Sequence, residues 1–411
     1  MSISIETTVG DAVPLRHPRE AGPVLVRLGS STIDTADGCP LHRVTKYRQG
    51  DAMSVVRVYL IAIAVTYLPA LLAVLFGPLP ILAPNPFVKL PFFYDWNFAF
   101  AFLVTFPCVV TFTMTDQTAL ASALADIQRD GVLILPDDVA YELCRKWQRR
   151  FRIVNRASLI IAGLACALMI VFNCIAYSTP GVGFWVSITG ELRSKMVACA
   201  FLYCICCLYS VDLIYIIRSV AMSVFLNDVA VHGQLRLLPF HPDKCGGLRP
   251  IGRFGLRDQY VMTLLGINIA FLVIVTVRYL QPPSTLWGLV GAAAVVYMIL
   301  GPTAFVAPLL SFHGAMIRTK AELLSEIAQR LRVELQRLRK ELPSGKLLRE
   351  DEELIDRLRK VGAVIDQLPV WPFDAATLRR FLTAYGTPLI GMVSYNWLRG
   401  LMQGFLAWMN H

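Results

Sequence analysis

Asp212 is the residue whose type and position most clearly suggest chemistry. It lies within an apolar stretch long enough to cross a membrane, and Tyr209 and Tyr215 lie three residues to either side on the same helical face. An ionisable side chain in such a stretch costs free energy and therefore indicates a function. The predicted function is an ion or proton site, or a counter-charge to a ligand. The alternative is a structural ion pair with a basic residue such as Arg399, or contact with interfacial water.

Polar residues in two other apolar stretches extend this candidate path. Asn268 lies in the fifth stretch, where hydrogen bonding between helices is the alternative explanation. Asn396, Arg399 and Gln403 follow one another at spacings of three and four, so they share one face of the last apolar helix. This stripe faces a polar path if the helix crosses the membrane, and faces water if the helix lies in the interface. We favour crossing, so that the stripe, Asp212 and Asn268 predict a polar path through the membrane.

The segment His-Pro-Asp-Lys-Cys-Gly-Gly-Leu, residues 241–248, is a third concentration of chemically capable side chains. His232, His241, Asp243 and Cys245 are all of types that bind zinc, although their spacing matches no strong zinc motif. A metal site here would support a membrane enzyme. The alternative is a structured turn, in which the proline fixes one backbone dihedral, the glycines permit positive φ and the aspartate accepts hydrogen bonds from nearby backbone N–H groups.

Two resemblances involve this loop. Residues 241–244 resemble the tripeptide and lysine that J-domain co-chaperones present to their partner chaperone, but the long basic helix that precedes them in that family is missing here. The loop and the segment Leu-Pro-Val-Trp-Pro-Phe-Asp, residues 368–374, together resemble uncharacterised bacterial multi-pass membrane proteins. Those proteins pair an HPD-x-x-GGL-type loop with a WPFD-type segment before the last apolar helix. The resemblance covers residues 235–390 and implies a membrane protein, with no activity attached.

The elements that must position these residues are apolar helices. The chain of 411 residues is 55% hydrophobic and only 17% charged, against about 25% charged in soluble proteins, and its mean hydropathy is +0.55. This composition argues against a soluble enzyme domain and against a disordered chain. Six stretches approach the roughly 20 apolar residues that a spanning helix needs: they are residues 55–76, 98–114, 158–175, 196–217, 260–280 and 286–310. Residues 388–409 form a seventh, polar-interrupted stretch.

The distribution of lysine and arginine predicts the orientation of these spans. Basic residues collect before the first span, between the second and third, between the fourth and fifth, and after the sixth, whereas the other connections carry few. By the positive-inside rule the N-terminus is cytoplasmic. The resemblance to bacterial membrane proteins implies a bacterial inner membrane as the location. Loops that face anionic lipid also explain the net charge of +10, so we expect no nucleic-acid partner.

The soluble parts follow from the same patterns. Residues 1–53 are predicted to be a weakly ordered cytoplasmic arm with a short strand at residues 24–28. Residues 54–311 are predicted to form a six-helix transmembrane core with cytoplasmic loops at 116–156 and 219–257. Residues 312–370 show leucine-rich periodicity around a turn signal at Pro-Ser-Gly, which predicts a cytoplasmic helical hairpin. The hairpin packs on itself or makes a coiled-coil contact between subunits, which would give a homo-oligomer. Residues 371–411 return to the membrane as a seventh span or an interfacial helix.

The sequence therefore predicts an all-α, polytopic membrane protein with six or seven transmembrane helices. The leading function is a channel-like or transporter-like conduit, or a membrane sensor on the same frame. The alternatives are a membrane scaffold that acts through the hairpin, and a membrane enzyme with a metal site between residues 232 and 245. The sequence contains no nucleotide-binding or hydrolase motif and calls for no cofactor, so an enzyme is disfavoured. The expected partners are the lipid bilayer and a second copy of the chain.

Overall fold

The computed structural model describes most of the chain between residues 25 and 391. The ranges that it describes are residues 25–37, 39, 41, 52–76, 90–177, 185–186, 192–238, 241–243, 245–279, 284–341, 349–367 and 369–391. The structure is 84% helical, which confirms the all-α prediction. Within the described ranges six helices are long and apolar enough to cross a membrane, which confirms a polytopic membrane protein.

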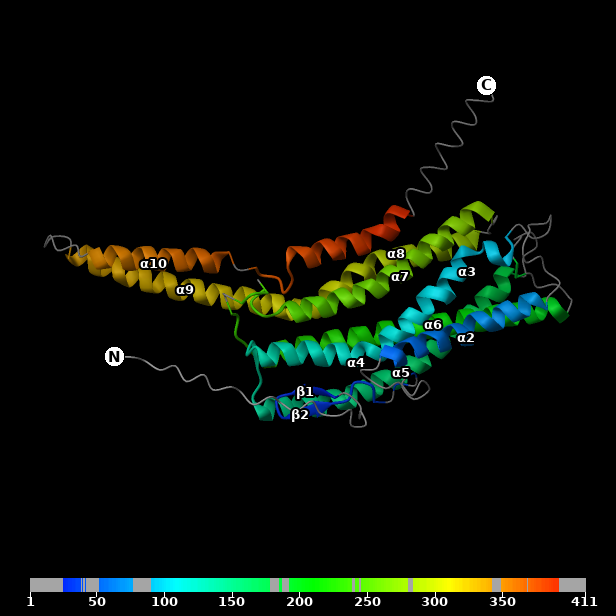
Figure 1. The fold of residues 1–411 in the computed structure, drawn as a ribbon, viewed down its shortest axis with the longest axis horizontal. Helices are drawn as coiled ribbons and strands as arrows, with labels where there is room; N and C mark the ends of the chain where they lie inside the picture. Colours follow the sequence, from blue (N-terminus) through cyan, green and yellow to red (C-terminus); the bar gives the residue numbers. More distant parts are fainter. Residues whose placement is uncertain are drawn as a thin grey trace, which may run out of the picture.

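The helices form an elongated bundle from which one helical pair projects (Figure 1). The α-helices are α2 (Ala52–Leu75), α3 (Trp96–Phe100), α4 (Phe106–Arg129), α5 (Asp137–Tyr177), α6 (Leu192–His232), α7 (Arg249–Tyr279), α8 (Ser284–Val306), α9 (Leu310–Glu341) and α10 (Arg349–Asp366). Short helical turns are η1 (Phe92–Tyr94), the π-helix η2 (Ala101–Thr105) and η3 (Ala307–Leu309). Residues 375–391 form a further helix, which runs alongside α7 and α8 in Figure 1.

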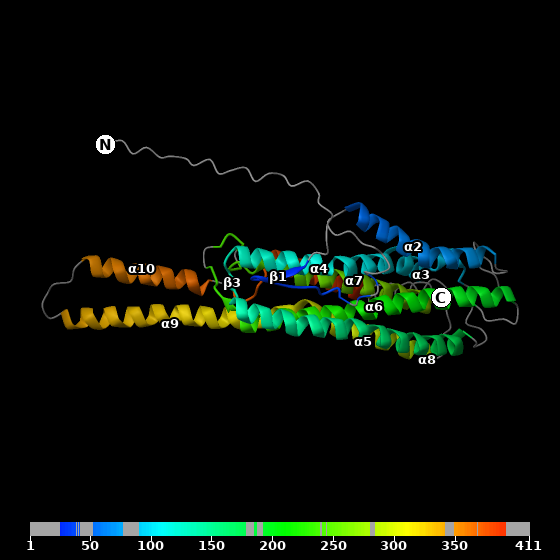
Figure 2. The ribbon, with the colours of Figure 1, turned by 90° about the horizontal axis from the view of Figure 1, so that it is seen from below.

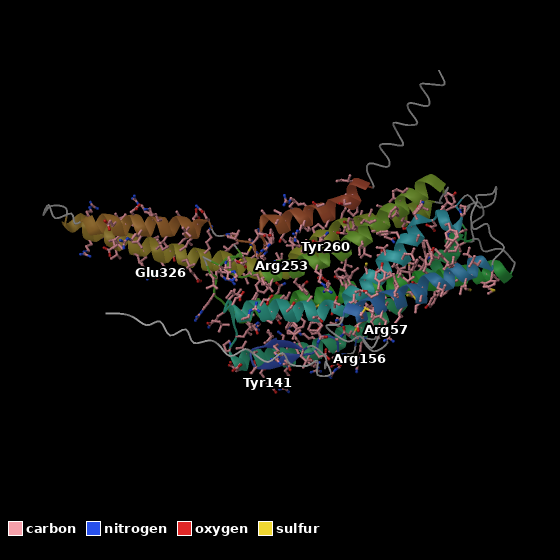
Figure 3. All side chains as sticks on the ribbon, in the orientation of Figure 1. Arg57, Tyr141, Arg156, Arg253, Tyr260 and Glu326 are labelled. Carbon is pink, nitrogen blue, oxygen red and sulfur yellow. The ribbon has the colours of Figure 1, made fainter. Side chains whose placement is uncertain are left out.

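Several helices are much longer than a bilayer requires. The 41 residues of α5 and of α6 correspond to about 60 Å each, roughly twice the thickness of a hydrocarbon core. Each therefore has an apolar part and a polar extension at one end of the bundle. We call that end, formed by residues 119–156, residues 219–257 and the start of α9, the basic end. Figure 3 shows Tyr141 of α5 there and Glu326 farther out on α9.

Two short antiparallel sheets lie at the basic end. Strand β1 (Val26–Leu28) pairs with β2 (Ser31–Ile33), and β3 (Leu133–Ile134) pairs with β4 (Gln234–Leu235). The side chains of Val26 and Leu28 are completely buried against α4 and α5. Residues 25–37 of the predicted N-terminal arm are thus packed, and β1 lies within the short strand expected at residues 24–28, because the alternating apolar residues of two three-residue strands cover a helical surface.

The buried apolar residues form two clusters along the bundle. One cluster joins α2, α4, α6 and α7 and includes Phe102, Phe201 and Trp185. The second lies at the basic end, where Trp147 and Phe225 pack with the β1–β2 strands and the start of α9. Outer faces of the first region expose large apolar side chains, such as Leu164 at 67%. Lipid is the solvent that suits such a face.

Helices α9 and α10 confirm the expected hairpin over residues 312–370. The two arms pack along each other in both views (Figure 1 and Figure 2). Leu358 is partly buried and Ile365 is 7% exposed, so both turn toward α9. Gly362 also faces α9, because a Cβ added there would lie 3.7 Å from Cγ2 of Ile327. The two arms of the hairpin therefore pack against each other, although some apolar residues of each arm lie outside this contact.

Candidate functional site: an intramembrane cavity

A cavity of about 310 Å³ lies between α5, α6, α7 and α8. Most of its wall is aliphatic, with Met169 of α5, Leu208 of α6, Met262 of α7 and Val296 of α8 as examples. Its volume lies at the lower end of the roughly 300–1,000 Å³ of small-molecule sites. The cavity is therefore large enough for a small ligand, and most of its surface suits an apolar one.

Three buried polar atoms at the wall of this cavity have no hydrogen-bond partner among the described residues. They are Oδ1 of Asp212, Nδ2 of Asn268 and Oγ1 of Thr105, each from a different part of the fold. Buried polar groups are nearly always paired, so each exception requires an explanation. Of these three side chains, Asp212 and Asn268 are half-buried and Thr105 is fully buried, so the first two are the polar side chains that a molecule in the cavity would meet.

Asp212 is placed by the helical repeat of α6. Leu208 and Ile216 lie one turn before and after it and also line the cavity, so this face of α6 is apolar except for the carboxyl group. Tyr209 of the same helix shares the wall. No hydrogen bond or ion pair to the carboxyl group of Asp212 occurs among the described residues. An ionised carboxylate in these surroundings lacks the compensation that burial requires.

Thr105 reaches the cavity because the helix that carries it is distorted. Pro107 has no backbone N–H, so the carbonyl group of Leu103 loses its usual helical donor. The hydroxyl group of Tyr59 donates to that carbonyl oxygen at 2.7 Å. Residues Ala101–Thr105 wind as a π-helix, a rare form that frequently marks functional sites. Thr105, its last residue, is fully buried with an unpaired hydroxyl group.

The wall near Asn268 depends on a glycine on α7. A Cβ added at Gly266 would lie 2.4 Å from Cζ of Tyr297, so only glycine allows this tyrosine ring to pack so closely. Tyr297 lines the cavity and donates from its hydroxyl group to the carbonyl oxygen of Tyr385 at 3.1 Å. The two rings also stack, with centroids 5.7 Å apart. Helix 375–391 thereby braces one wall of the cavity.

A layer of buried polar side chains lies between the cavity and the basic end. The carboxyl group of Asp258 on α7 accepts hydrogen bonds from the hydroxyl groups of Tyr215 at 2.7 Å and Ser219 at 2.6 Å. All three side chains are less than a tenth exposed. Because Tyr215 and Ser219 belong to α6, these bonds fix α6 against α7 just beyond the cavity.

Arg218 forms the most extensive part of this layer and is 1% exposed. Its guanidinium group donates to both carboxylate oxygens of Asp116 on α4, with Nη2 2.8 Å from Oδ2 and 3.1 Å from Oδ1. Nη1 donates to Oδ1 of Asn155 on α5 at 2.8 Å and to the carbonyl oxygen of Thr35 at 3.3 Å. The network joins α4, α5, α6 and the segment after β2. Every arm of the buried charge is therefore paired, unlike Asp212.

The structure brings together part of the predicted polar path. Asp212 and Asn268 line the same cavity, as the path requires. Asn396, Arg399 and Gln403 lie outside the described residues, so the stripe that they form stays a prediction.

The loop motif forms a compact turn held by Asp243. The carboxylate of Asp243 accepts hydrogen bonds from the backbone N–H groups of Cys245 at 2.8 Å, Gly247 at 3.0 Å and Arg249 at 3.2 Å. Burial favours the neutral acid, but these N–H donors outweigh it, and the pKa of Asp243 lies below its ordinary value of 3.8. His241 lies 2.8 Å from the same carboxylate. Both oxygens are thus occupied by the loop itself.

The arrangement of this loop gives little support to a metal centre. Among the described residues no group of three or more histidine, cysteine or acidic side chains is placed to hold a metal ion. Cys245 is completely buried, and burial followed by the charge of Asp243 raises the pKa of its thiol to about 12. The thiolate, which is the form that binds metals and attacks electrophiles, is therefore scarce at neutral pH.

The segment at residues 369–374 packs against the start of α7, directly after the loop. Arg249, directly after the loop, forms an ion pair of 3.1 Å with Asp374 of the WPFD-type segment. A Cβ at Gly252 would lie 2.3 Å from the carbonyl oxygen of Pro372, so the backbones approach closely there. Trp371 stacks on His313 with ring centroids 3.8 Å apart. These contacts dock the start of helix 375–391 onto α7 and α9.

Sequence reasoning missed Thr105 and the charged layer for separate reasons. Thr105 gives no signal in a span, because threonine in helices usually bonds its own backbone. Arg218 follows directly after the predicted end of the fourth span, at residue 217, where nothing in the sequence distinguishes it from a flanking positive charge. Asp116 and Asp258 likewise lie at the edges of predicted spans. Only the extension of α4, α6 and α7 beyond the apolar stretches shows that they are buried together.

Comparison with known proteins adds no functional information. The chain matches no protein-family model, no curated protein and no solved structure.

Proposed function

We propose that this protein is a transporter-like conduit whose substrate occupies the cavity between α5, α6, α7 and α8. If the protein is instead a membrane sensor, the same cavity in the same helical bundle would bind its ligand. The observation that carries the proposal is the convergence of three unpaired buried polar atoms, from Asp212, Asn268 and Thr105, on one cavity in a chain with six span-like helices. An aqueous channel would need a continuous polar lining, whereas this wall is mostly aliphatic, so binding followed by release fits better than free conduction.

The proposed setting is a bacterial inner membrane with the basic end in the cytoplasm. The positive-inside rule supports this orientation, because loops 116–156 and 219–257 carry many arginines. In that orientation the cavity lies within the membrane, and the layer around Arg218 lies between the cavity and the cytoplasmic core.

The experiment that tests the proposal is electrical recording from proteoliposomes on a solid-supported membrane, which detects charge moved by any substrate. The purified full chain is exposed to jumps of pH, of inorganic cations and of small organic amines. We expect at least one of these to displace charge, and we expect Asp212→Asn to reduce the displaced charge by about tenfold or more, since the carboxylate contacts the substrate.

Asp126→Asn is the matched control for this experiment. Asp126 is an exposed acidic residue of α4, paired at 2.9 Å with Arg129 one turn away, and lies far from the cavity wall. Its variant should behave like the unmodified protein. Charge movements that Asp212→Asn leaves unchanged would contradict the proposal, as would their complete absence with a correctly folded protein.

A second candidate function is a scaffold that assembles through the α9–α10 hairpin. One observation favours it: both arms keep large apolar side chains at the surface, including Val333 at 56%, Leu335 at 46% and Val361 at 45% exposure. The hairpin projects away from the bundle, where these side chains are free of lipid in the proposed orientation (Figure 1). Association of two copies would cover them.

Light scattering on the purified protein tests this second candidate. We expect the unmodified chain to exceed the mass of a 45.7 kDa monomer, and the pair Leu335→Asp with Val361→Asp to return it to the monomer mass. Gln336→Asp adds one negative charge at a neighbouring exposed polar position and serves as the control for each of the two single substitutions. An unchanged mass in the double variant would leave the hairpin with a purely structural role.

A further inference from the structure

We propose that the cavity takes a lipophilic monocation, that is, an amine or onium group attached to an apolar body. The inference rests on the proposed function, since it names the chemical class of the substrate for the same site. The positive group would lie beside Asp212, and the body would contact the aliphatic residues of α5, α6, α7 and α8.

The charge of the ligand follows from the side chains of the wall. Asp212 is the one acidic side chain that lines the cavity, and the described wall contains no lysine, arginine or histidine. A buried carboxylate is stable when a cation pairs with it, and the described residues supply none there. A ligand that carries its own positive charge completes the pair.

The apolar body follows from the shape and composition of the cavity. A bare inorganic cation prefers a cage of several oxygen ligands, and it would leave most of a volume of about 310 Å³ without contacts. Asn268, which is half-buried, adds a second polar side chain to the wall that Asp212 lines. A largely apolar body with one charged group satisfies both parts of the wall.

The position of Val296 indicates how such a ligand enters. This residue lines the cavity and is also 52% exposed on the apolar outer surface of α8. The cavity therefore extends to a face that suits lipid. Molecules that partition into the bilayer reach this face without crossing the polar layer around Arg218.

Tetraphenylphosphonium and tetraphenylborate form the test pair, because they have nearly the same shape and opposite charge. Binding of each ion to the full chain in lipid nanodiscs is measured by equilibrium dialysis, with empty nanodiscs as the blank. We expect saturable binding of the phosphonium alone. Asp212→Asn should weaken it by about tenfold or more, because the buried charge loses its partner, and Asp126→Asn should leave it unchanged. Size-exclusion profiles confirm that each variant is folded.

Three outcomes would overturn the inference. They are equal binding of the two ions, phosphonium binding that survives Asp212→Asn, and no saturable phosphonium binding above the blank. If Arg399→Gln creates binding that the unmodified chain lacks, then Asp212 is paired with Arg399 and the inference is likewise wrong. Should protons or inorganic cations give Asp212-dependent currents without phosphonium binding, the conduit stands and the ligand class falls. If phosphonium binds but no substrate gives a current, the ligand class stands and the conduit falls.

Discussion

The two charged residues at the centre of α6 differ in how their charge is compensated. Arg218 is surrounded by Asp116, Asn155 and the carbonyl oxygen of Thr35, and all its donors toward them are used in short hydrogen bonds. Asp212 faces a cavity without a partner among the described residues. A fully paired buried charge has a structural role, whereas an unpaired one is a cost that folding alone does not explain. Substitutions at the two positions should therefore have opposite effects on stability.

Replacing Asp212 by leucine should raise the melting temperature of the purified protein by a few degrees while abolishing ligand binding. The substitution removes a buried polar group that lacks a partner and extends the apolar surface of Leu208 and Ile216. Differential scanning fluorimetry in detergent measures the effect. Leu213→Ile, a conservative change at the neighbouring wall position, controls for repacking. A clear fall in melting temperature after Asp212→Leu would show that the carboxyl group has a structural partner.

Replacing Arg218 by methionine should destabilise the protein by about 3–5 kcal/mol, because Asp116 is left as an uncompensated buried charge. The double variant Arg218→Met with Asp116→Leu should recover most of that loss, since no charge then stays buried. Denaturant unfolding of the single and double variants gives the coupling energy as a double-mutant cycle. Simple additivity of the two single substitutions would argue against a coupled pair.

At the scale of single elements, short segments at the basic end stabilise long helices. Strands β1 and β2 have only three residues each, yet their inward side chains are buried between α4 and α5. The loop after β4 is equally compact, because one carboxylate accepts three backbone N–H groups. Both segments hold together helix extensions that would otherwise be isolated in water.

Ile33→Ala should cost about 2–5 kcal/mol, the usual range for emptying a well-packed aliphatic site. Ile33 is 1% exposed at the end of β2, whereas Thr32 beside it is exposed and provides the control substitution Thr32→Ala. Hydrogen exchange should show faster opening of residues 120–129 and 140–155 in the Ile33 variant. If the exchange rates are equal in both variants, the strands do not contribute to the stability of the helical bundle.

The loop that Asp243 organises should lose its order in acid. Its carboxyl group has a lowered pKa in the folded protein, so its contribution is complete above the ordinary value of 3.8 and disappears as pH falls through the lower folded value. The protection factors of the Cys245 and Gly247 amides, taken against the intrinsic exchange rate at each pH, should then fall about tenfold, as expected for a lost charge-assisted hydrogen bond. Asp243→Asn should show fast exchange already at pH 7. Protection factors that stay constant between pH 5 and pH 2 would contradict this assignment.

At the scale of the whole molecule, a polar layer separates two apolar cores. The membrane core contains Phe102 and Trp185, the core of the basic end contains Trp147 and Phe225, and the network of Arg218 lies between them. Long helices make this stacking feasible, since α5 and α6 pass through both cores. The cavity lies on the membrane side of the polar layer, so the layer closes it toward the basic end.

The orientation of the whole chain is tested with reporter fusions. Green fluorescent protein at the N-terminus, or inserted between α9 and α10, should fluoresce, because both sites are expected in the cytoplasm. Alkaline phosphatase after His411 should be active, since we expect residues 388–409 to cross the membrane as a seventh span. An inactive phosphatase with a fluorescent C-terminal fusion would instead place that segment in the interface and remove Arg399 from the membrane path.

Whether a site residue could be predicted from the sequence depends on whether its role requires contacts with distant segments. Asp212 and Asn268 can be recognised in the sequence, because a polar residue within an apolar stretch is costly in a bilayer whatever its partners are. Thr105 could not be found, since its place at the cavity wall depends on a π-helix and on Tyr59 from a different helix. Arg218 and Asp116 are far apart in sequence and pair only after α4 and α6 pack.

The sequence by itself determined the membrane-spanning helices, the helical hairpin and the two candidate polar residues within the spans. These depend on local composition and periodicity, which the bilayer and the helical repeat translate directly into structure. Only the tertiary structure decided that residues 25–37 are packed, that the loop at residues 241–248 is a turn held by its own aspartate, and that Asp212, Asn268 and Thr105 share one cavity. Each of these depends on which surfaces meet, and contacts between distant segments leave no periodic signal in a single sequence.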